Sequence, residues 1–87
     1  MTRYAVVRLA RSREEVEAYL PDNYRVVSSH LAEPVDGGRQ HVVIEGEDAH
    51  GWTLDAYVIP RLASGLLFAK EYPSLHDATD AACASMN

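Results

Sequence analysis

The chain has 87 residues, 47% of them hydrophobic and 24% charged, which predicts one folded domain over residues 1–87 rather than a disordered chain. Its net charge of −5 argues against a nonspecific nucleic-acid binder, because phosphate affinity comes mainly from cationic contacts. No apolar run approaches the roughly 20 residues that a membrane helix needs, and the single cysteine, Cys83, cannot form an internal disulfide. We therefore expect a cytoplasmic protein without a membrane partner.

The first strand is predicted over residues 3–9, where Tyr and Val are frequent and Gly and Pro are missing. A short helix over residues 13–20 follows. Ser12 can accept a hydrogen bond from the amide of Glu15, and the Glu15 carboxylate can reach back, which is the pattern of a capping box. Pro21 ends this helix, because proline cannot continue the hydrogen-bond ladder.

Two further strands are predicted over residues 24–31 and 40–47, with the turn-forming residues Asp36, Gly37 and Gly38 between them. Glycine tolerates positive φ and so favours a chain reversal. The two strands are therefore expected to form a hairpin with a slightly long loop.

The segment from residue 51 to residue 72 is apolar on nearly every side and allows two interpretations. In one, residues 52–59 form a fourth strand and Pro60 begins a helix at its favoured first position. In the other, Thr53 caps a helix and Asp55 lies in its first turn, while apolar residues recur at helical spacing. We favour the second interpretation, a helix over residues 53–70 that is kinked at Pro60.

The last part of the chain has the weakest pattern. Ser74 and Asp77 have the spacing of another capping box, but most apolar residues that follow are alanines, which bury little. We expect a weak helix or a tail over residues 74–87. The element order β-α-β-β-α-α then predicts an α+β fold, with a three-stranded sheet and helices packed mainly on one face.

Residues that could perform catalysis are scattered. Asp48, His50 and His41 are the best candidates for a small metal-dependent or hydrolytic enzyme, but their spacing does not match a closed zinc site. Two serines precede His30, but consecutive residues of a strand point to opposite faces and do not form a nucleophile–base pair. Cys83 is interpreted as a small packing residue. We therefore expect no enzyme, no bound metal and no cofactor.

The apolar segment offers a candidate partner-binding surface. On a helical wheel one arc can pack on a sheet, and a second apolar side remains for another contact. The residues proposed for that contact are Trp52, Tyr57, Arg61, Leu67 and Phe68. Arg61 follows Tyr57 by four residues, so its guanidinium can stack on the ring and bind a carboxylate of a partner. A structural ion pair within the chain is the equal alternative.

The N-terminal part is basic and the remainder is acidic. Residues 1–13 contain four arginines and no acid, a charge of +4, whereas the remaining residues contain four cations and thirteen acids, 4 − 13 = −9. The arginines are candidates for binding a nucleic acid or an acidic partner; they are Arg3, Arg8, Arg11 and Arg13. The alternative is that they flank a strand and balance the acids of the helix that follows.

The sequence GWTLDAYVIPRLASGL, preceded by VVIEG, resembles a short signature in small uncharacterised proteins encoded by phages of GC-rich actinobacteria. The resemblance covers most of residues 40–71, with weaker support from LPDNYRVV. It implies a small accessory or host-interacting viral protein and assigns no catalytic residue.

The sequence thus predicts a small protein-interaction or regulatory domain that self-associates as a homodimer or binds a host protein. The alternative is a nucleic-acid-associated regulator that uses the N-terminal arginines. A small metal-dependent or hydrolytic enzyme is the weaker alternative.

Overall fold

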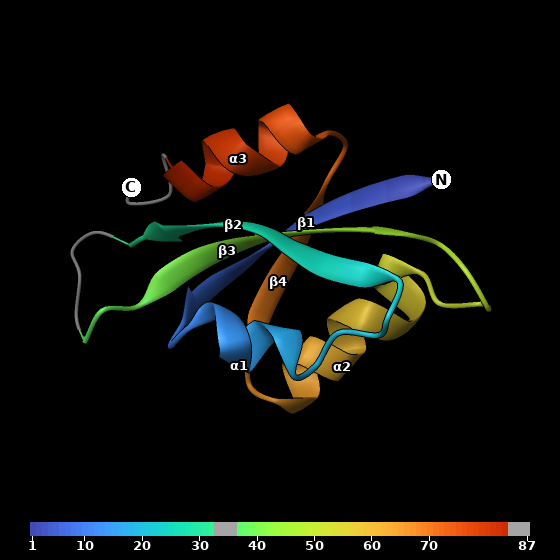
Figure 1. Cartoon of the computed structure of the whole chain (residues 1–87), viewed down its shortest axis with the longest axis horizontal. Helices are drawn as coiled ribbons and strands as arrows, with labels where there is room; N and C mark the ends of the chain where they lie inside the picture. The colour runs from blue at the N-terminus through green and yellow to red at the C-terminus, as the bar shows by residue number, and fades with distance from the viewer. Residues whose placement is uncertain (33–36, 84–87) are drawn as a thin grey trace.

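A computed structural model describes residues 1–32 and 37–83 of the chain. Its centre is a four-stranded antiparallel sheet in the order β2-β3-β1-β4 (Figure 1). The elements in chain order are β1 (Thr2–Ala10), α1 (Arg13–Glu17), β2 (Tyr24–Leu31), β3 (Gln40–Glu47), η1 (Leu54–Val58), α2 (Ile59–Ser64), β4 (Phe68–Tyr72) and α3 (Leu75–Cys83).

The strands follow a split β-α-β connectivity. β1-α1-β2 and β3-α2-β4 are two β-α-β units, and each places a strand between the two strands of the other. This is the connectivity of the ferredoxin-like fold, with α3 added at its end. The connectivity alone assigns no function, because such folds carry many unrelated activities.

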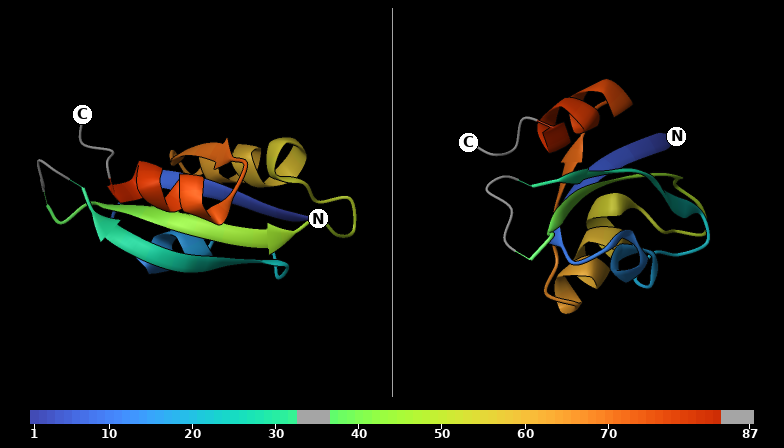
Figure 2. Two further views of the ribbon diagram at one scale, coloured as in Figure 1. Left: turned by 90° about the horizontal axis from the view of Figure 1, so that it is seen from above. Right: turned by 60° about the vertical axis from the view of Figure 1, so that its left-hand side comes forward.

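Helices cover both faces of the sheet (Figure 1, Figure 2). α1, η1 and α2 pack on one face around a core that includes Val7, Ile44 and Leu62. α3 packs on the other face, against Val6 and Val43. The prediction of three strands is therefore wrong, because β4 adds a fourth, and the helix α3 covers the face that the prediction left largely open. The buried residues of α3 are alanines, whose small side chains gave little indication that this helix covers a face.

The first half of the chain follows the sequence pattern closely, except that α1 ends at Glu17 and not at residue 20. β2 and β3 have the predicted bounds. Ser12 Oγ accepts a hydrogen bond from the Glu15 amide at 3.2 Å, and the Glu15 carboxylate accepts one from the Arg11 amide. The helix cap is confirmed, although the returning bond goes to Arg11 rather than to Ser12.

Pro60 produces a wide turn at the point where a kink was predicted. Thr53 caps the helix, and its hydroxyl oxygen accepts a hydrogen bond from the Ala56 amide at 3.1 Å. η1 is a π-helical turn, in which the amides of Val58 and Ile59 donate to carbonyls five residues earlier. Because Pro60 has no N–H to donate, the ladder is rearranged before it, and a regular α-helix follows. The helical interpretation is thus confirmed over the strand for residues 54–59.

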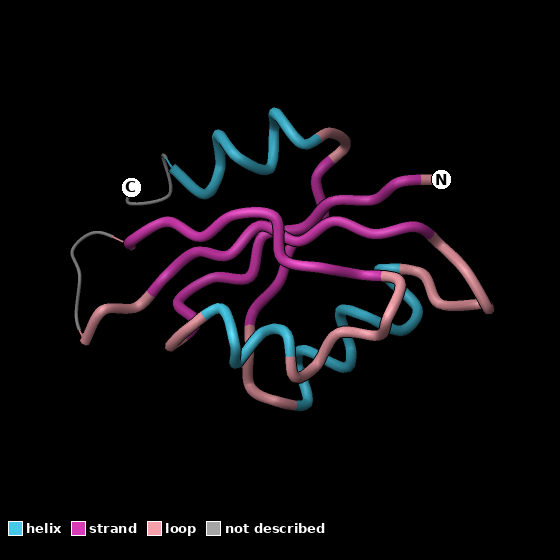
Figure 3. The backbone as a smooth tube through the Cα atoms, in the orientation of Figure 1, coloured by secondary structure: helices cyan, strands magenta, loops and turns pink. Residues whose placement is uncertain are grey.

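The predicted helix over residues 53–70 is wrong at its C-terminal end. α2 ends at Ser64, and a turn leads into β4, the fourth strand (Figure 3). Two backbone hydrogen bonds close the turn: the Leu66 amide donates to Ala63, and the Leu67 amide donates to Leu62. This is the bond pattern of a Schellman motif, which ends a helix. The helical spacing had continued through Leu66 only by coincidence.

The C-terminal segment forms a helix over Leu75–Cys83, with the Ser74 hydroxyl accepting a hydrogen bond from the Asp77 amide. The last part of the predicted segment, residues 84–87, lies outside the described residues, as does Asp36 of the predicted hairpin turn.

Candidate functional site

One end of the sheet is held by a polar network that joins all four strands. Arg3 on β1 donates to Asp48 at 2.6 Å and to Glu71 on β4 at 3.0 Å. The Tyr24 hydroxyl on β2 donates to the other Asp48 oxygen at 3.0 Å, and Asp48 directly follows β3. Each charge therefore has a partner within the chain, and we call this set of four residues the polar network.

The polar network shifts the pKa values of its members. Burial and the bond to Asp48 raise the pKa of Tyr24 above its ordinary value. The hydrogen bonds to Glu71 and Asp48 raise the pKa of Arg3. Burial favours a higher pKa for Asp48, but the hydrogen bonds from Arg3 and Tyr24 outweigh it and lower the pKa. These pKa shifts result from the ion pairs and hydrogen bonds that hold the fold together, so they do not by themselves indicate a catalytic acid or base.

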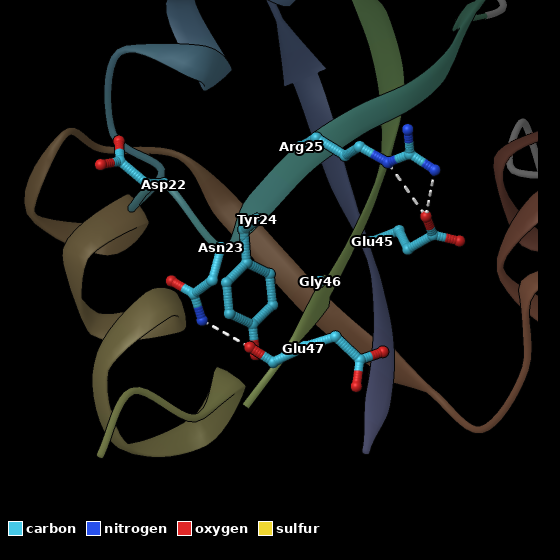
Figure 4. A pocket seen from close by; sticks show the side chains of 7 residues that line it. All are labelled: Asp22, Asn23, Tyr24, Arg25, Glu45, Gly46 and Glu47. Carbon is cyan, nitrogen blue, oxygen red and sulfur yellow. Dashed lines mark hydrogen bonds and ion pairs between the residues drawn. The ribbon is translucent and has the colours of Figure 1, made fainter. Parts of the chain in front are cut away.

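A shallow pocket of about 140 Å³ lies beside this network, at the start of β2 and the end of β3 (Figure 4). The ring of Tyr24 lies over Gly46, and a Cβ atom there would be only 2.4 Å from ring carbons. Arg25 and Glu45 form an ion pair of 2.7 Å at the pocket. The two opposite charges of Arg25 and Glu45 are thus paired with each other, whereas the buried Asn23 Oδ1 at the pocket has no hydrogen-bond partner among the described residues. Gly46 leaves the space that the Tyr24 ring occupies.

An array of aromatic rings lies on the outer side of η1 and α2. Trp52 and Tyr57 stack with ring centroids 5.1 Å apart and an interplanar angle of 7°. The Arg61 guanidinium lies 5.8 Å from the Tyr57 ring centre and donates to the Tyr57 hydroxyl and to the Tyr19 carbonyl. Within the described residues Arg61 forms no ion pair, so the structural ion pair considered from the sequence is absent there. Its contacts instead join α2 to the segment after α1.

A second group of exposed apolar side chains lies at the opposite end of β1. Leu9 is 55% exposed, Leu66 93% and Phe68 63%. Arg8 pairs directly with Phe68 across β1 and β4. Leu9 therefore lies near the start of β4, which follows the turn after α2. We call Leu9, Leu66 and Phe68 the apolar patch.

Both leucines of the apolar patch have a left-handed backbone. Leu9 has φ 58° at a β-bulge, where two residues of β1 face one of β3, and Leu66 has φ 64° in the turn after α2. Glycine is the usual residue at both kinds of position, because a side chain there costs about 1 kcal/mol or more. In this turn glycine stands one residue earlier, at Gly65, where a Cβ would lie 2.4 Å from the Tyr19 ring.

Cations lie around the apolar patch. Lys70 follows Phe68 by two residues and so shares its face of β4. Arg39 donates to the Leu9 carbonyl at 3.2 Å. In the described ranges, Arg8, Arg39 and Lys70 form no ion pair, unlike Arg25 at the shallow pocket and Arg3 in the polar network.

The structure separates the partner-binding residues predicted from the sequence. Leu67 is 7% exposed and belongs to the core, so its prediction as a contact residue is wrong. Phe68 is exposed but lies on the strand β4, whereas Tyr57, which stacks on Trp52, lies on η1. The predicted surface was drawn on one continuous helix, and the turn after α2 divides it.

The four N-terminal arginines also fail to form a single group. Arg3 is held in the polar network at the start of β1. Arg11 pairs with Glu15 at 3.8 Å. Arg8 and Arg13 lie near the other end of β1 and form no ion pair in the described part of the chain. The alternative interpretation, in which the arginines flank a strand and balance the acids of the helix that follows, describes Arg11 alone, because Arg3 pairs with Asp48 and Glu71 instead.

The residues considered for a metal or hydrolytic site do not come together. Asp48 belongs to the polar network, and exposed His50 lies edge-on to Trp52, with ring centroids 6.4 Å apart. His41 is buried and its Nδ1 accepts a hydrogen bond from the Leu9 amide. Over residues 1–32 and 37–83, no group of three or more His, Cys, Asp and Glu side chains could hold a metal ion.

One contact chain was missed by the sequence analysis. Ser28 and His30 are two residues apart in β2 and share a face, and Ser28 Oγ lies 3.0 Å from His30 Nε2. Cys83 Sγ at the end of α3 lies 3.6 Å from His30 Nδ1. An imidazole between a thiol and a hydroxyl can activate a nucleophile. Here it joins α3 to the edge strand β2, a role beyond the packing predicted for Cys83.

Comparisons of the chain with protein-family models, with curated proteins and with solved structures gave no match. Among the residues that the structure describes, no helix has both the length and the apolar character needed to cross a membrane.

Proposed function

We propose that the chain is a protein-interaction domain that docks through the apolar patch. One observation carries the proposal: Leu9 and Leu66 occupy left-handed backbone positions and expose most of their side chains. At such positions a side chain strains the backbone, and Leu66, which is 93% exposed, gains little burial within the chain in return. A contact with another molecule gives these side chains a favourable role, and exposed apolar groups are typical of such contacts.

The proposal retains the earlier prediction of a regulatory or accessory protein that binds a second copy or a host protein. It moves the binding surface from the Trp52, Tyr57 and Arg61 array to the apolar patch, because the array is already engaged in contacts within the chain.

Photo-crosslinking tests the proposal in cells that make the protein naturally. Phe68 is replaced by p-benzoylphenylalanine, which keeps an aromatic ring at the position, and exposed Ala63 on α2 receives the same analogue as a control. We expect protein adducts from position 68 that disappear when Leu66→Gly is added. Equal adducts from both positions, or none from position 68, would show that the patch is not a docking surface.

A further inference from the structure

We infer that the apolar patch receives an acidic amphipathic segment of another protein, one that combines large apolar side chains with Asp or Glu. The inference rests on the proposed function, since it names the partner of the same surface. It depends on the charges around the patch, which the proposed function does not use.

The apolar patch is bordered by cations that form no ion pair with any carboxylate in residues 1–32 and 37–83. Arg8 lies directly across from Phe68, and Lys70 lies two residues farther along the same face. Arg39 binds the Leu9 carbonyl rather than an acid. Among the described residues none of these three cations forms an ion pair. A carboxylate brought by a partner would meet them beside the apolar contact.

A second copy of the chain docked patch against patch is disfavoured by the same charges. The two-fold axis of such a dimer brings identical surfaces together, so Arg8 and Lys70 of one copy would approach their equivalents in the other. Like charges at an interface are unfavourable, most of all where water is excluded. The charges therefore favour a different surface with acidic groups.

Nucleic acids and anionic membranes fit the patch less well. Leucine side chains make no favourable contact with phosphate, and Phe68 is the one aromatic ring in the patch, whereas single-strand binders stack successive bases on several rings. The net charge of −5 also repels both kinds of polyanion at a distance, beyond the local basic region. A short acidic segment at the patch interacts mainly with the nearby cations.

Fluorescence polarisation with a synthetic probe tests the inference on the purified chain. The probe is a labelled peptide of about 15 residues, with Leu and Phe on one helical face and Glu on the other. Three comparison probes are the same peptide with Lys for Glu, the Glu peptide with Gln for Leu and Phe, and a single-stranded oligothymidylate. Phosphatidylserine vesicles form a fourth arm. We expect saturable binding of the acidic amphipathic peptide alone, weakened by added salt.

Four variants locate the binding surface. Phe68→Ser should weaken binding about tenfold, because it removes an aromatic anchor, and Lys70→Gln and Arg8→Gln should each weaken it about threefold. Arg61→Gln is the matched control, since Arg61 is also a cation without an ion pair in the described residues but lies in the aromatic array. It should leave the affinity unchanged. Thermal unfolding of each variant verifies that the fold is retained.

Several outcomes overturn the inference. Equal binding of the Lys peptide removes the charge argument, and equal binding of the Gln-substituted peptide removes the apolar one. Tighter binding of oligothymidylate or vesicles, lost in Phe68→Ser, assigns the patch to a nucleic acid or a lipid surface. If no peptide binds but position 68 still crosslinks to protein, the proposed function holds and the partner class is wrong. If both tests are negative, both fail.

Discussion

The two ends of β1 are built in opposite ways. At its start, Arg3 joins a network in which each charge has a partner, and Gly46 nearby leaves room for the Tyr24 ring. At its other end, Leu9 and Leu66 stand where the backbone favours glycine and expose their side chains. The first end has glycine where packing requires it, and the second lacks glycine where the backbone favours it. The difference indicates that the first end serves the fold and the second serves a contact.

Gly46→Ala should cause the largest loss of stability. A Cβ at this position would lie 2.4 Å from the Tyr24 ring and 2.5 Å from the Asn23 carbonyl, and backbone cannot move aside as a flexible side chain can. We expect a loss of about 3 kcal/mol in the free energy of unfolding by urea. Gly51→Ala is the control, because a Cβ there meets nothing within 4 Å and only the positive φ opposes it. An equal loss in both variants would contradict a close packing role for Gly46.

Tyr24→Phe should cost about 1 kcal/mol at neutral pH, because it removes the hydroxyl that donates to Asp48. The pKa of Tyr24 is raised in the folded chain, so the hydroxyl stabilises the fold below its ordinary pKa of about 10. That contribution is lost as the pH rises above 10 and the unfolded chain ionises first. Alkaline unfolding curves should therefore be flatter in the Phe variant. Unchanged stability at pH 7 would mean that the network does not hold this end.

Leu66→Gly should make the chain more stable by about 1 kcal/mol, because glycine adopts the left-handed conformation without strain. Leu66→Ala is the matched control: it removes most of the exposed apolar surface but keeps the Cβ, so it should give little gain. Chemical unfolding of both variants measures the difference. If Leu66→Gly lowers stability, the side chain serves the fold and the contrast between the two ends is lost.

Acidification should affect the apolar end through His41. Burial, together with the charges of Arg8 and His30, lowers the pKa of His41 in the folded chain. The neutral ring thus stabilises the fold above its ordinary pKa of about 6.5, and this stability decreases as the pH falls below that value. His41→Asn keeps an acceptor for the Leu9 amide and does not titrate. We expect the smallest effect here: between pH 7 and pH 5 the free energy of unfolding should fall less steeply in the His41→Asn variant than in the natural sequence. An identical slope in both proteins would assign the loss to other groups.

Local patterns predicted the first half of the fold well. Ser12 with Glu15 gave the start of α1, and the β-branched runs gave β2 and β3. Thr53 gave the start of the helical segment, and Pro60 gave the place where its hydrogen bonds change. These features depend on neighbours in the sequence, which is why the sequence could reveal them.

The fourth strand was missed because its pattern is short and its partner is distant. Phe68, Lys70 and Tyr72 alternate with smaller or acidic residues, as in a strand, but the helical spacing extended through Leu66 and concealed the change of period. Gly65 was the available signal for the end of the helix. Pairing with β1, about sixty positions earlier in the chain by the register Arg8 to Phe68, then decides the conformation.

The binding surface could be predicted only in part. Phe68 was identified from its apolar character, and Leu67 was assigned to the wrong side because the segment was treated as one helix. Leu9 and Leu66 were not identified, since a single sequence does not show which residues adopt a positive φ. That property arises from the bulge in β1, which depends on pairing with β3, and from the turn after α2, whose local hydrogen bonds have no distinctive sequence pattern at Leu66.

The most direct test of the account is a measurement of stability and docking on one double variant, Leu9→Gly with Leu66→Gly. Its free energy of unfolding is determined by urea, and its docking is determined by crosslinking from position 68. The account predicts a more stable chain that no longer forms adducts, because strain and contact are removed together. A less stable chain, or adducts at the level of the natural sequence, would contradict the claim that these leucines are kept for a partner.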